Sequence, residues 1–241
     1  MRDDKGIAVA APSANSDTDV DLWIDRLKDR HAARRLYAAG VLSQLGPHAR
    51  AAVPALSEAL KDPTPEVRRM AVVALSEIGP EARPALPALV QALRDPHEVV
   101  RCRAMMALAE MGPDARMAVP ALIQMLSDAS RLVRRWAAAT LGEIGPTAPA
   151  AIPALIEALA GDDTVNRAVA AAALGKMRGR AAPRLMEALS HRDPNVRRCA
   201  ARLLGDCPRG GDAAPALAGL LIDPDPLVRE AAADALRKIP D

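Results

Sequence analysis

The amino-acid sequence predicts an all-α solenoid of about seven helix-pair repeats, and three observations lead to this prediction. Proline recurs at a step of 33 residues in Pro54, Pro87, Pro120 and Pro153, where it opens a phrase of the form PALxxAL. Arginine and glycine keep the same step at other positions of the repeat. Half of the residues are hydrophobic, although Phe is absent, Tyr occurs once and Trp twice. Ala, Leu and Val can fill a thin stack of helices, whereas a compact core normally relies on aromatic side chains.

Two other columns of residues define the length of the repeat. Glycine closes it in Gly46, Gly79, Gly112 and Gly145, each time followed by proline. After Pro153 the proline step shortens to 30 and then 32 residues, so the last repeats diverge. The columns place one solenoid domain at residues 19–241, with repeats at about 19–46, 47–79, 80–112, 113–145, 146–178, 179–208 and 209–241. A valine-arginine column runs through Arg35, Arg68, Arg101, Arg134, Arg167, Arg197 and Arg229.

Each repeat is predicted to form two helices joined by a turn. The first, helix A, carries the PALxxAL phrase, and its proline falls in the opening turn, where a missing N–H is tolerated. An Asp-Pro turn such as Asp62-Pro63 follows and starts helix B. Helix B is predicted over Pro65–Ile78, because its apolar residues recur with the period of an amphipathic helix. Gly-Pro then ends the helix, with glycine in a left-handed conformation.

Residues 1–18 contain Pro, Ser, Asn, Asp and Thr and are predicted to form a mobile polar tail. Asp3 and Asp4 do not fit the positive start of a signal peptide. No uncharged apolar run is long enough to predict a membrane span. Three cysteines without a CxxC pair favour a reducing compartment. We therefore expect a cytoplasmic protein that does not associate with a membrane.

One consensus phrase, GPxAxxxxPALxxALxDPxxxVRxxAxxALxxIG, describes the repeats and is matched closely by residues 82–112 and 117–145. It resembles the HEAT repeat, in the short form called PBS-lyase HEAT-like, over nearly all of the chain after residue 18. The resemblance implies a HEAT/armadillo-like superhelix whose B helices line a concave face. It does not imply one function, since such proteins include scaffolds, transport factors, bilin lyase subunits, an iron hydroxylase and DNA glycosylases.

Sequence motifs for enzyme chemistry are absent. There is no GxSxG, no HExxH and no glycine-rich phosphate loop. His97-Glu98 is the single His-Glu pair, whereas the two-iron site of the hydroxylases that this repeat resembles needs several. The similar DNA glycosylases use aromatic residues in a basic cleft, which two Trp and a net charge of +2 fit poorly. We therefore expect no enzyme, no catalytic residue, no metal site and no cofactor.

The arginines of the valine-arginine column allow two interpretations. They could form a basic track for phosphates, or each could bond the turn aspartate of its own or a neighbouring repeat. An aspartate stands six residues before the arginine in three successive repeats, at Asp62, Asp95 and Asp128. Because planar arginine binds a carboxylate well, this register favours the structural interpretation.

Apolar pairs that lie off the main stripe of helix B are the positions that folding explains least. They are Val72-Val73, Met105-Met106 and Ala138-Ala139. Exposed together, they would form an apolar strip on the concave side of repeats two to four, and such a strip usually marks a partner. Extra packing against helix A explains them equally well. The hypothesis is that the strip binds a helix or loop of another protein.

A second set of arginines lies near the start of the B helices and forms either a solvated charged face or a site for an anionic partner. Trp136 shares a column with Met70 and Cys199, so it is either a core residue or a binding anchor. The leading hypothesis is a non-enzymatic scaffold that binds another protein along the B helices. The alternatives are a nucleic-acid binder that uses these arginines and an accessory subunit of a lyase. The predicted contact residues are Arg69, Val72, Val73, Arg103, Met105, Met106, Arg135, Trp136, Arg198 and Arg202.

Overall fold

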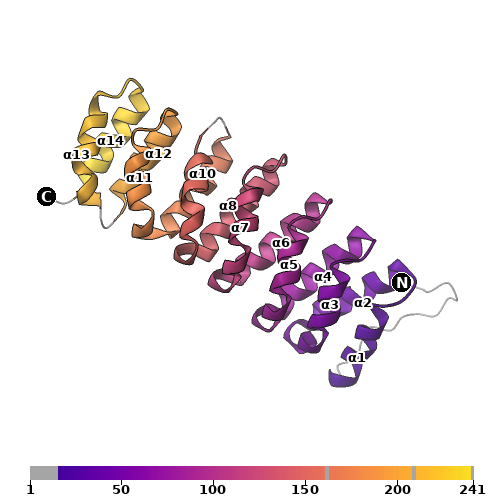
Figure 1. Ribbon diagram of the computed structural model, residues 1–241. Helices are drawn as coiled ribbons and strands as arrows, with labels where there is room; N and C mark the ends of the chain where they lie inside the picture. The colour runs from indigo at the N-terminus through magenta and orange to yellow at the C-terminus, as the bar shows by residue number, and fades with distance from the viewer. Residues whose placement is uncertain (1–15, 161–162, 208–209, 240–241) are drawn as a thin grey trace. The chain divides into compact units, whose positions relative to one another are not determined.

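The computed structural model describes residues 16–160, 163–207 and 210–239, and every regular element in these ranges is a helix (Figure 1). A and B helices alternate along the chain, and 3₁₀ segments precede the A helices after the first. The predicted all-α solenoid is therefore confirmed. The chain divides into two compact units, an N-terminal unit of Met1–Ala85 and a C-terminal unit of Leu86–Asp241.

The N-terminal unit contains two helix pairs. Helix α1 begins at Ser16, so the predicted polar tail of residues 1–18 is wrong for its last three residues, and residues 1–15 lie outside the described ranges. Ser, Asp and Thr are as typical of helix starts as of loops, which explains the error. The two B helices of this unit, α2 and α4, contact each other, and α3 contacts α4. The elements are α1 (Ser16–Arg26), α2 (Ala32–Leu45), η1 (Gly46–Ala52), α3 (Val53–Ala59), α4 (Pro65–Ile78) and η2 (Gly79–Ala85).

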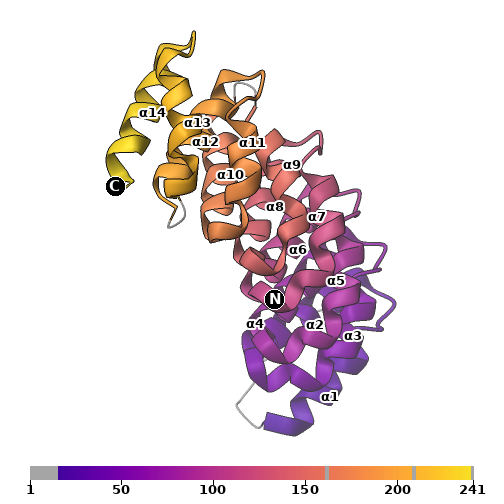
Figure 2. The ribbon, with the colours of Figure 1, turned by 60° about the vertical axis from the view of Figure 1, so that its left-hand side comes forward.

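The C-terminal unit contains five helix pairs in two layers. Its A helices are α5 (Leu86–Ala92), α7 (Val119–Met125), α9 (Ile152–Glu157), α11 (Ala182–Ala188) and α13 (Ala214–Gly219). Its B helices are α6 (Glu98–Glu110), α8 (Arg131–Ile144), α10 (Thr164–Lys176), α12 (Pro194–Gly205) and α14 (Pro226–Lys238). Figure 2 shows the A helices along one side of this unit and the B helices along the other. Each B helix contacts the next B helix and the A helix of its own repeat.

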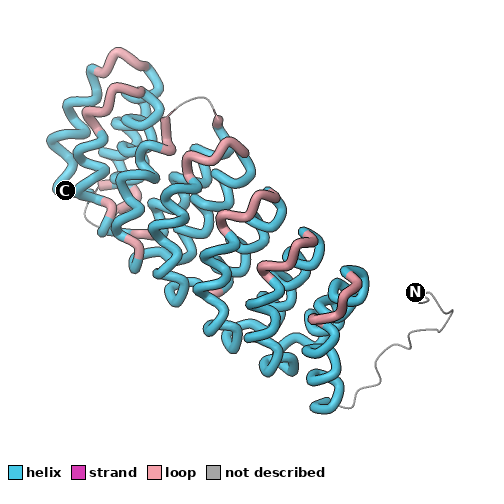
Figure 3. The backbone as a smooth tube through the Cα atoms, turned by 45° about the vertical axis from the view of Figure 1, so that its right-hand side comes forward, coloured by secondary structure: helices cyan, strands magenta, loops and turns pink. Residues whose placement is uncertain are grey.

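Short loops join the A and B helices of a repeat, as the tube in Figure 3 shows. The return from B to A runs through 3₁₀ segments, which the sequence motifs did not predict. In the C-terminal unit these are η3 (Gly112–Ala118), η4 (Gly145–Thr147), η5 (Pro149–Ala151), η6 (Arg178–Arg180) and η7 (Gly210–Ala213), while η8 (Leu220–Ile222) follows α13.

Helix ends follow the predicted chemistry, with one difference. The B helix predicted over Pro65–Ile78 has these bounds as α4, and Pro54 lies in the first turn of α3. The glycine after α8, Gly145, has φ +62° and ψ −136°. This is not the predicted left-handed helical conformation but an extended one at positive φ, which is essentially restricted to glycine. The glycine column therefore marks a conformational requirement at the end of the B helix.

Small residues let neighbouring B helices approach closely. A Cβ atom added at Gly142 of α8 would lie 2.9 Å from the Cα atom of Ala173 in α10, closer than real Cβ atoms come. Glycine at this position lets the two helix backbones approach. Thr140 is fully buried and its Oγ1 lies 3.0 Å from the carbonyl oxygen of Met105, which joins α8 to α6. Close approach of helices explains how the chain forms a core without phenylalanine.

Candidate functional site

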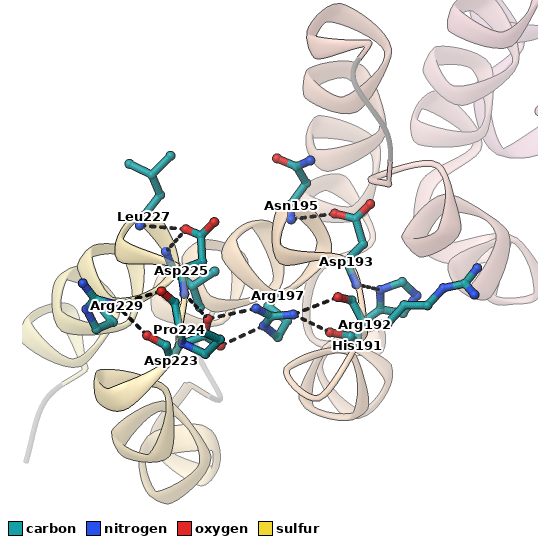
Figure 4. Close-up of polar contacts among 11 residues, drawn as sticks. His191, Arg192, Asp193, Asn195, Arg197, Asp223, Pro224, Asp225, Leu227 and Arg229 are labelled. Atoms are coloured by element: carbon teal, nitrogen blue, oxygen red, sulfur yellow. Dashed lines mark hydrogen bonds and ion pairs between the residues drawn. The ribbon is translucent and has the colours of Figure 1, made fainter.

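Arginines of the valine-arginine column join successive repeats. Arg35 in α2 donates to Asp62 through both prongs of its guanidinium, at 2.6 Å from Nε and 2.9 Å from Nη2. Arg197 in α12 binds Asp223 in the same way, at 2.8 and 2.9 Å. Figure 4 shows the Arg197 guanidinium between this carboxylate and two backbone carbonyls of its own turn. The structural interpretation of the column is therefore confirmed at these positions.

Each turn aspartate also binds the start of its own B helix. Asp62 accepts a hydrogen bond from the Thr64 N–H at 2.8 Å, and Asp223 accepts one from the Asp225 N–H at 2.9 Å. The Arg197 guanidinium, together with this N–H, holds the pKa of Asp223 below its ordinary value. Burial acts to raise the pKa of Asp62, but its hydrogen bonds outweigh burial and the pKa is lowered. These carboxylates are charged at neutral pH, and their hydrogen bonds connect the turn to the arginine of the preceding repeat and to the start of the B helix.

The predicted contact residues of the N-terminal unit differ in exposure. Val72 of α4 is buried, with 1% of its surface exposed, so its predicted place on an apolar surface strip is wrong. The cause is that α4 contacts α2 as well as α3, which widens its buried stripe beyond one helix face. Arg69 and Val73 are half-buried and keep part of their side chains at the surface.

The same correction applies in the C-terminal unit. Met105 of α6 is fully buried, and Ala138 of α8 is 2% exposed, because neighbouring B helices cover the first member of each predicted apolar pair. The second member, Met106, is half-buried, and Arg103 is exposed. The predicted strip is therefore one residue wide rather than two.

Two of the remaining predicted contact residues form hydrogen bonds between or within B helices. Arg135 of α8 donates from Nε to the side chain of Asn166 in α10 at 3.4 Å. Arg198 of α12 donates from Nη2 to the side chain of Asn195 at 3.0 Å. Both arginines are half-buried, as is Trp136, whereas Arg202 is exposed. The half-buried Trp136 is compatible with packing and with contact to a partner.

A row of exposed aliphatic residues was missed by the sequence analysis. Val99 of α6, Leu132 of α8 and Val165 of α10 are 55%, 42% and 48% exposed. They stand two residues before the arginine of the valine-arginine column and keep the step of 33 residues. These aliphatic residues are exposed at the same position of three successive repeats. Such an exposed apolar surface indicates an interaction site. The step of 33 residues is the sequence signal that identifies this row.

A shallow hollow adjoins this row. The exposed surface of the B helices that carries the row and the hollow is here called the open face. The volume of the hollow is about 280 Å³, and it lies between α8 and α10. Ala139, Ala168 and Ala172 line it, with Val165 among its walls. The ion pair between Lys176 and Glu143, at 2.5 Å, belongs to the same lining. The hollow can therefore receive a bulky apolar side chain.

Chemistry-bearing side chains do not gather in the described parts of the chain. Within residues 16–160, 163–207 and 210–239, no three His, Cys, Asp or Glu side chains form a group that could hold a metal ion. Burial raises the pKa of the Cys102 thiol to about 11 and also raises that of Cys199, so both thiols are protonated at neutral pH. No helix in these ranges is long and apolar enough to cross a membrane.

Comparisons with known proteins agree with this architecture. The model of the HEAT repeats family matches residues 20–93, 86–175 and 182–241, and that of the PBS lyase HEAT-like repeat matches residues 167–191. No curated protein matches the chain in sequence.

Solved structures are similar in fold. The complex of CpcE and CpcF of phycocyanin lyase from Nostoc sp. PCC7120 has a TM-score of 0.54 at 24% identity, covering 97% of this chain and 99% of that one. Kap121p has a TM-score of 0.69 at 16% identity, covering 91% of this chain and 29% of that one. An engineered protein has a TM-score of 0.54 at 23% identity, covering 91% and 96%. At these identities the likeness shows the fold alone. The family matches span most of the chain, and the protein therefore belongs to the HEAT-repeat family.

Proposed function

We propose that this protein is a non-enzymatic scaffold that binds another protein on the open face of α6, α8 and α10. The observation that carries the proposal is the exposed row of Val99, Leu132 and Val165. Burying such side chains against a partner is favourable by about 25 cal/mol for each Å² of apolar surface removed from water. The hollow beside Val165 adds a concave feature that a partner side chain can fill.

Two further points support a protein partner. The chain belongs to the HEAT-repeat family, and the CpcE–CpcF structure of similar fold is a complex between two proteins. The exposed row of Val99, Leu132 and Val165 is aliphatic, and Arg135 beside it is hydrogen-bonded to Asn166 of the neighbouring helix. A nucleic-acid partner would depend on unengaged basic groups and would be lost steeply with salt.

Site-specific photo-crosslinking tests the proposal. A photoreactive residue placed at Leu132 or Val165 is expected to give a discrete protein adduct in the cells of origin. The matched control is Met117, which is 48% exposed in η3 of the same unit but outside the open face. Adducts from position 117 that equal those from 132, adducts with nucleic acid, or no adducts would contradict the proposal.

A further inference from the structure

The open face changes character along the C-terminal unit, and this change points to the kind of partner. Resting on the proposed function, we infer that the partner is an amphipathic helix with aliphatic residues over α6, α8 and α10 and acidic residues over α12. The inference depends on three observations. They are the switch in side-chain chemistry between α10 and α12, the positive charge of Arg198 and Arg202 on α12, and the hydrogen bonds that already engage the amides of Asn166 and Asn195.

The switch occurs between two B helices that contact each other, α10 and α12. On α10 the lining of the hollow is aliphatic or small from Val165 to Ala173, and Lys176 at its end is paired with Glu143. The corresponding positions of α12, 30 residues later, are polar or basic. Asn195 occupies the position in α12 that Val165 has in α10, Arg198 the position of Ala168, and Arg202 the position of Ala172.

Two arginines of α12, Arg198 and Arg202, form no ion pair within the described parts of the chain. Arg202 is exposed, and Asp206, one turn further along the helix, is paired instead with Lys238 at 2.8 Å. Arg198 donates to Asn195 from Nη2, and its Nε is buried without a hydrogen-bond partner among the described residues. A carboxylate that approaches α12 therefore meets the exposed guanidinium of Arg202, with the positive charge of the half-buried Arg198 one helical turn before it, and can form charge-assisted hydrogen bonds with Arg202.

An extended partner segment fits this face poorly. Such a segment leaves backbone N–H and C=O groups that need partners from the surface it binds. The amide of Asn166 donates to the carbonyl of Arg131 at 3.3 Å and accepts from Arg135. The side chain of Asn195 already accepts from Arg198. A helix satisfies its own backbone groups and does not need these amides.

The spacing of the row suits a helix that crosses the B helices. Neighbouring helices in such a stack lie about 10 Å apart, and a helix rises about 1.5 Å per residue. A crossing helix therefore meets a new B helix about every seven residues, which is two turns, so the contacting residues share one face. The hollow of about 280 Å³ between α8 and α10 receives the largest of them.

Selection from a displayed library of helical peptides tests this inference. The library randomises one face of a helical host over about 25 residues, and the selection uses the full chain as bait. Enriched peptides are expected to carry aliphatic residues about seven apart followed by Asp or Glu at one end. Their affinity, measured by fluorescence anisotropy, should fall about tenfold for Arg202→Glu and for Leu132→Gln. Met117→Gln is the matched control and should leave affinity unchanged.

Charge exchange gives a sharper criterion. A peptide in which the acidic residues are replaced by Lys should bind the Arg202→Glu variant better than the original chain. Circular dichroism of each variant shows that the exposed substitutions leave the fold intact. Enrichment of basic or proline-rich peptides, affinity insensitive to Arg202→Glu, or no enrichment would overturn the inference. A protein adduct from position 132 combined with any of these results would retain the proposed scaffold function and reject only the acidic helix.

Discussion

A turn aspartate such as Asp223 holds groups from two repeats at once. Its carboxylate accepts from both prongs of Arg197 and from the backbone N–H of Asp225, as Figure 4 shows. The side chains of Arg197 and Asp223 are 13% and 5% exposed, so water replaces little of what a substitution removes. The start of α14 and its junction with α12 therefore depend on the same charged group.

Replacing this carboxylate tests the junction. Asp223→Asn keeps the side chain's size and one acceptor oxygen for Asp225, but it removes the charge that binds Arg197. Loss of a buried charge-assisted pair is expected to lower the free energy of unfolding by about 1–3 kcal/mol. Thermal denaturation followed by circular dichroism measures the change, with the exposed Asp21→Asn as control. Equal melting temperatures for the two variants would contradict the structural role.

Glycine in the B helices provides a matched pair of substitutions at one position of the repeat. Gly142 and Gly175 are 33 residues apart, but a Cβ at Gly142 would lie 2.9 Å from Ala173, whereas at Gly175 the nearest atom is 3.8 Å away. Gly142→Ala should destabilise the protein by about 1–3 kcal/mol through overpacking. Gly175→Ala should stabilise it by about 0.5–1 kcal/mol, because alanine favours helix. Urea denaturation measures both, and shifts of the same sign would contradict the packing argument.

At the scale of the helix, much of the fold was predictable because residues within each helix determine where it begins and ends. Proline in the first turn of α3 and glycine at positive φ after α8 are requirements that one residue type satisfies. The 3₁₀ segments such as η1 were not predictable, since the Gly-Pro motif marks a helix end without specifying the path that follows. The start of α1 was misplaced because its Ser and Asp are common in both tails and helix starts.

The candidate site was predicted less well, and the reason is physical. A periodic pattern identifies one buried stripe, but a B helix is also covered by the B helix beside it in the same unit. Helix α4, with buried Val72, contacts α2, and α6, with buried Met105, contacts α8. How wide the buried stripe becomes depends on neighbouring helices and cannot be read from one helix. Leu132 of α8 is left 42% exposed, so the neighbouring helices do not cover it.

The turns between A and B helices contain carboxyl groups whose pKa values are lowered. The backbone N–H of His31 donates a hydrogen bond to the carboxylate of Asp29, and this bond is the main cause that lowers the pKa of Asp29 to about 2. The pKa of Asp163 is also lowered, first by the N–H of Asn166, as are those of Asp62 and Asp223. A carboxyl whose folded-state pKa lies below its unfolded value stabilises the fold above the unfolded pKa, and this contribution is lost as pH falls.

Acid titration is therefore expected to lower the free energy of unfolding between about pH 5 and pH 2. Urea denaturation at a series of pH values measures the slope. The Asp62→Asn variant lacks one of the shifted carboxyls and should show a shallower slope than the original chain, while Asp21→Asn should keep it. A slope unchanged by Asp62→Asn would show that this turn does not carry the pH dependence.

At the scale of the whole molecule, the stability of a repeat stack is approximately a sum of local contributions, and within each unit a B helix contacts the next B helix. The two tryptophans lie in different units, so the fluorescence of each reports the unfolding of its own unit. Trp23 is buried in α1 of the N-terminal unit, where its ring meets that of Tyr37 edge to face at 5.6 Å. Trp136 is half-buried in α8 of the C-terminal unit. A variant that keeps one tryptophan therefore follows the unfolding of one unit.

Single-tryptophan variants test whether stability is local. In Trp136→Phe, fluorescence follows Trp23, and adding Asp62→Asn should lower the urea midpoint, because this substitution breaks the contact with Arg35 inside the N-terminal unit. In Trp23→Phe, fluorescence follows Trp136, and the same Asp62→Asn should shift the midpoint less, since its effect weakens with each repeat between the two sites. Gly142→Ala should give the reverse order, because it disturbs the packing of α8 on α10 beside Trp136. Equal shifts at both reporters would mean that the units unfold as one cooperative body, since nearest-neighbour coupling would then be strong enough to carry a local loss across the whole chain.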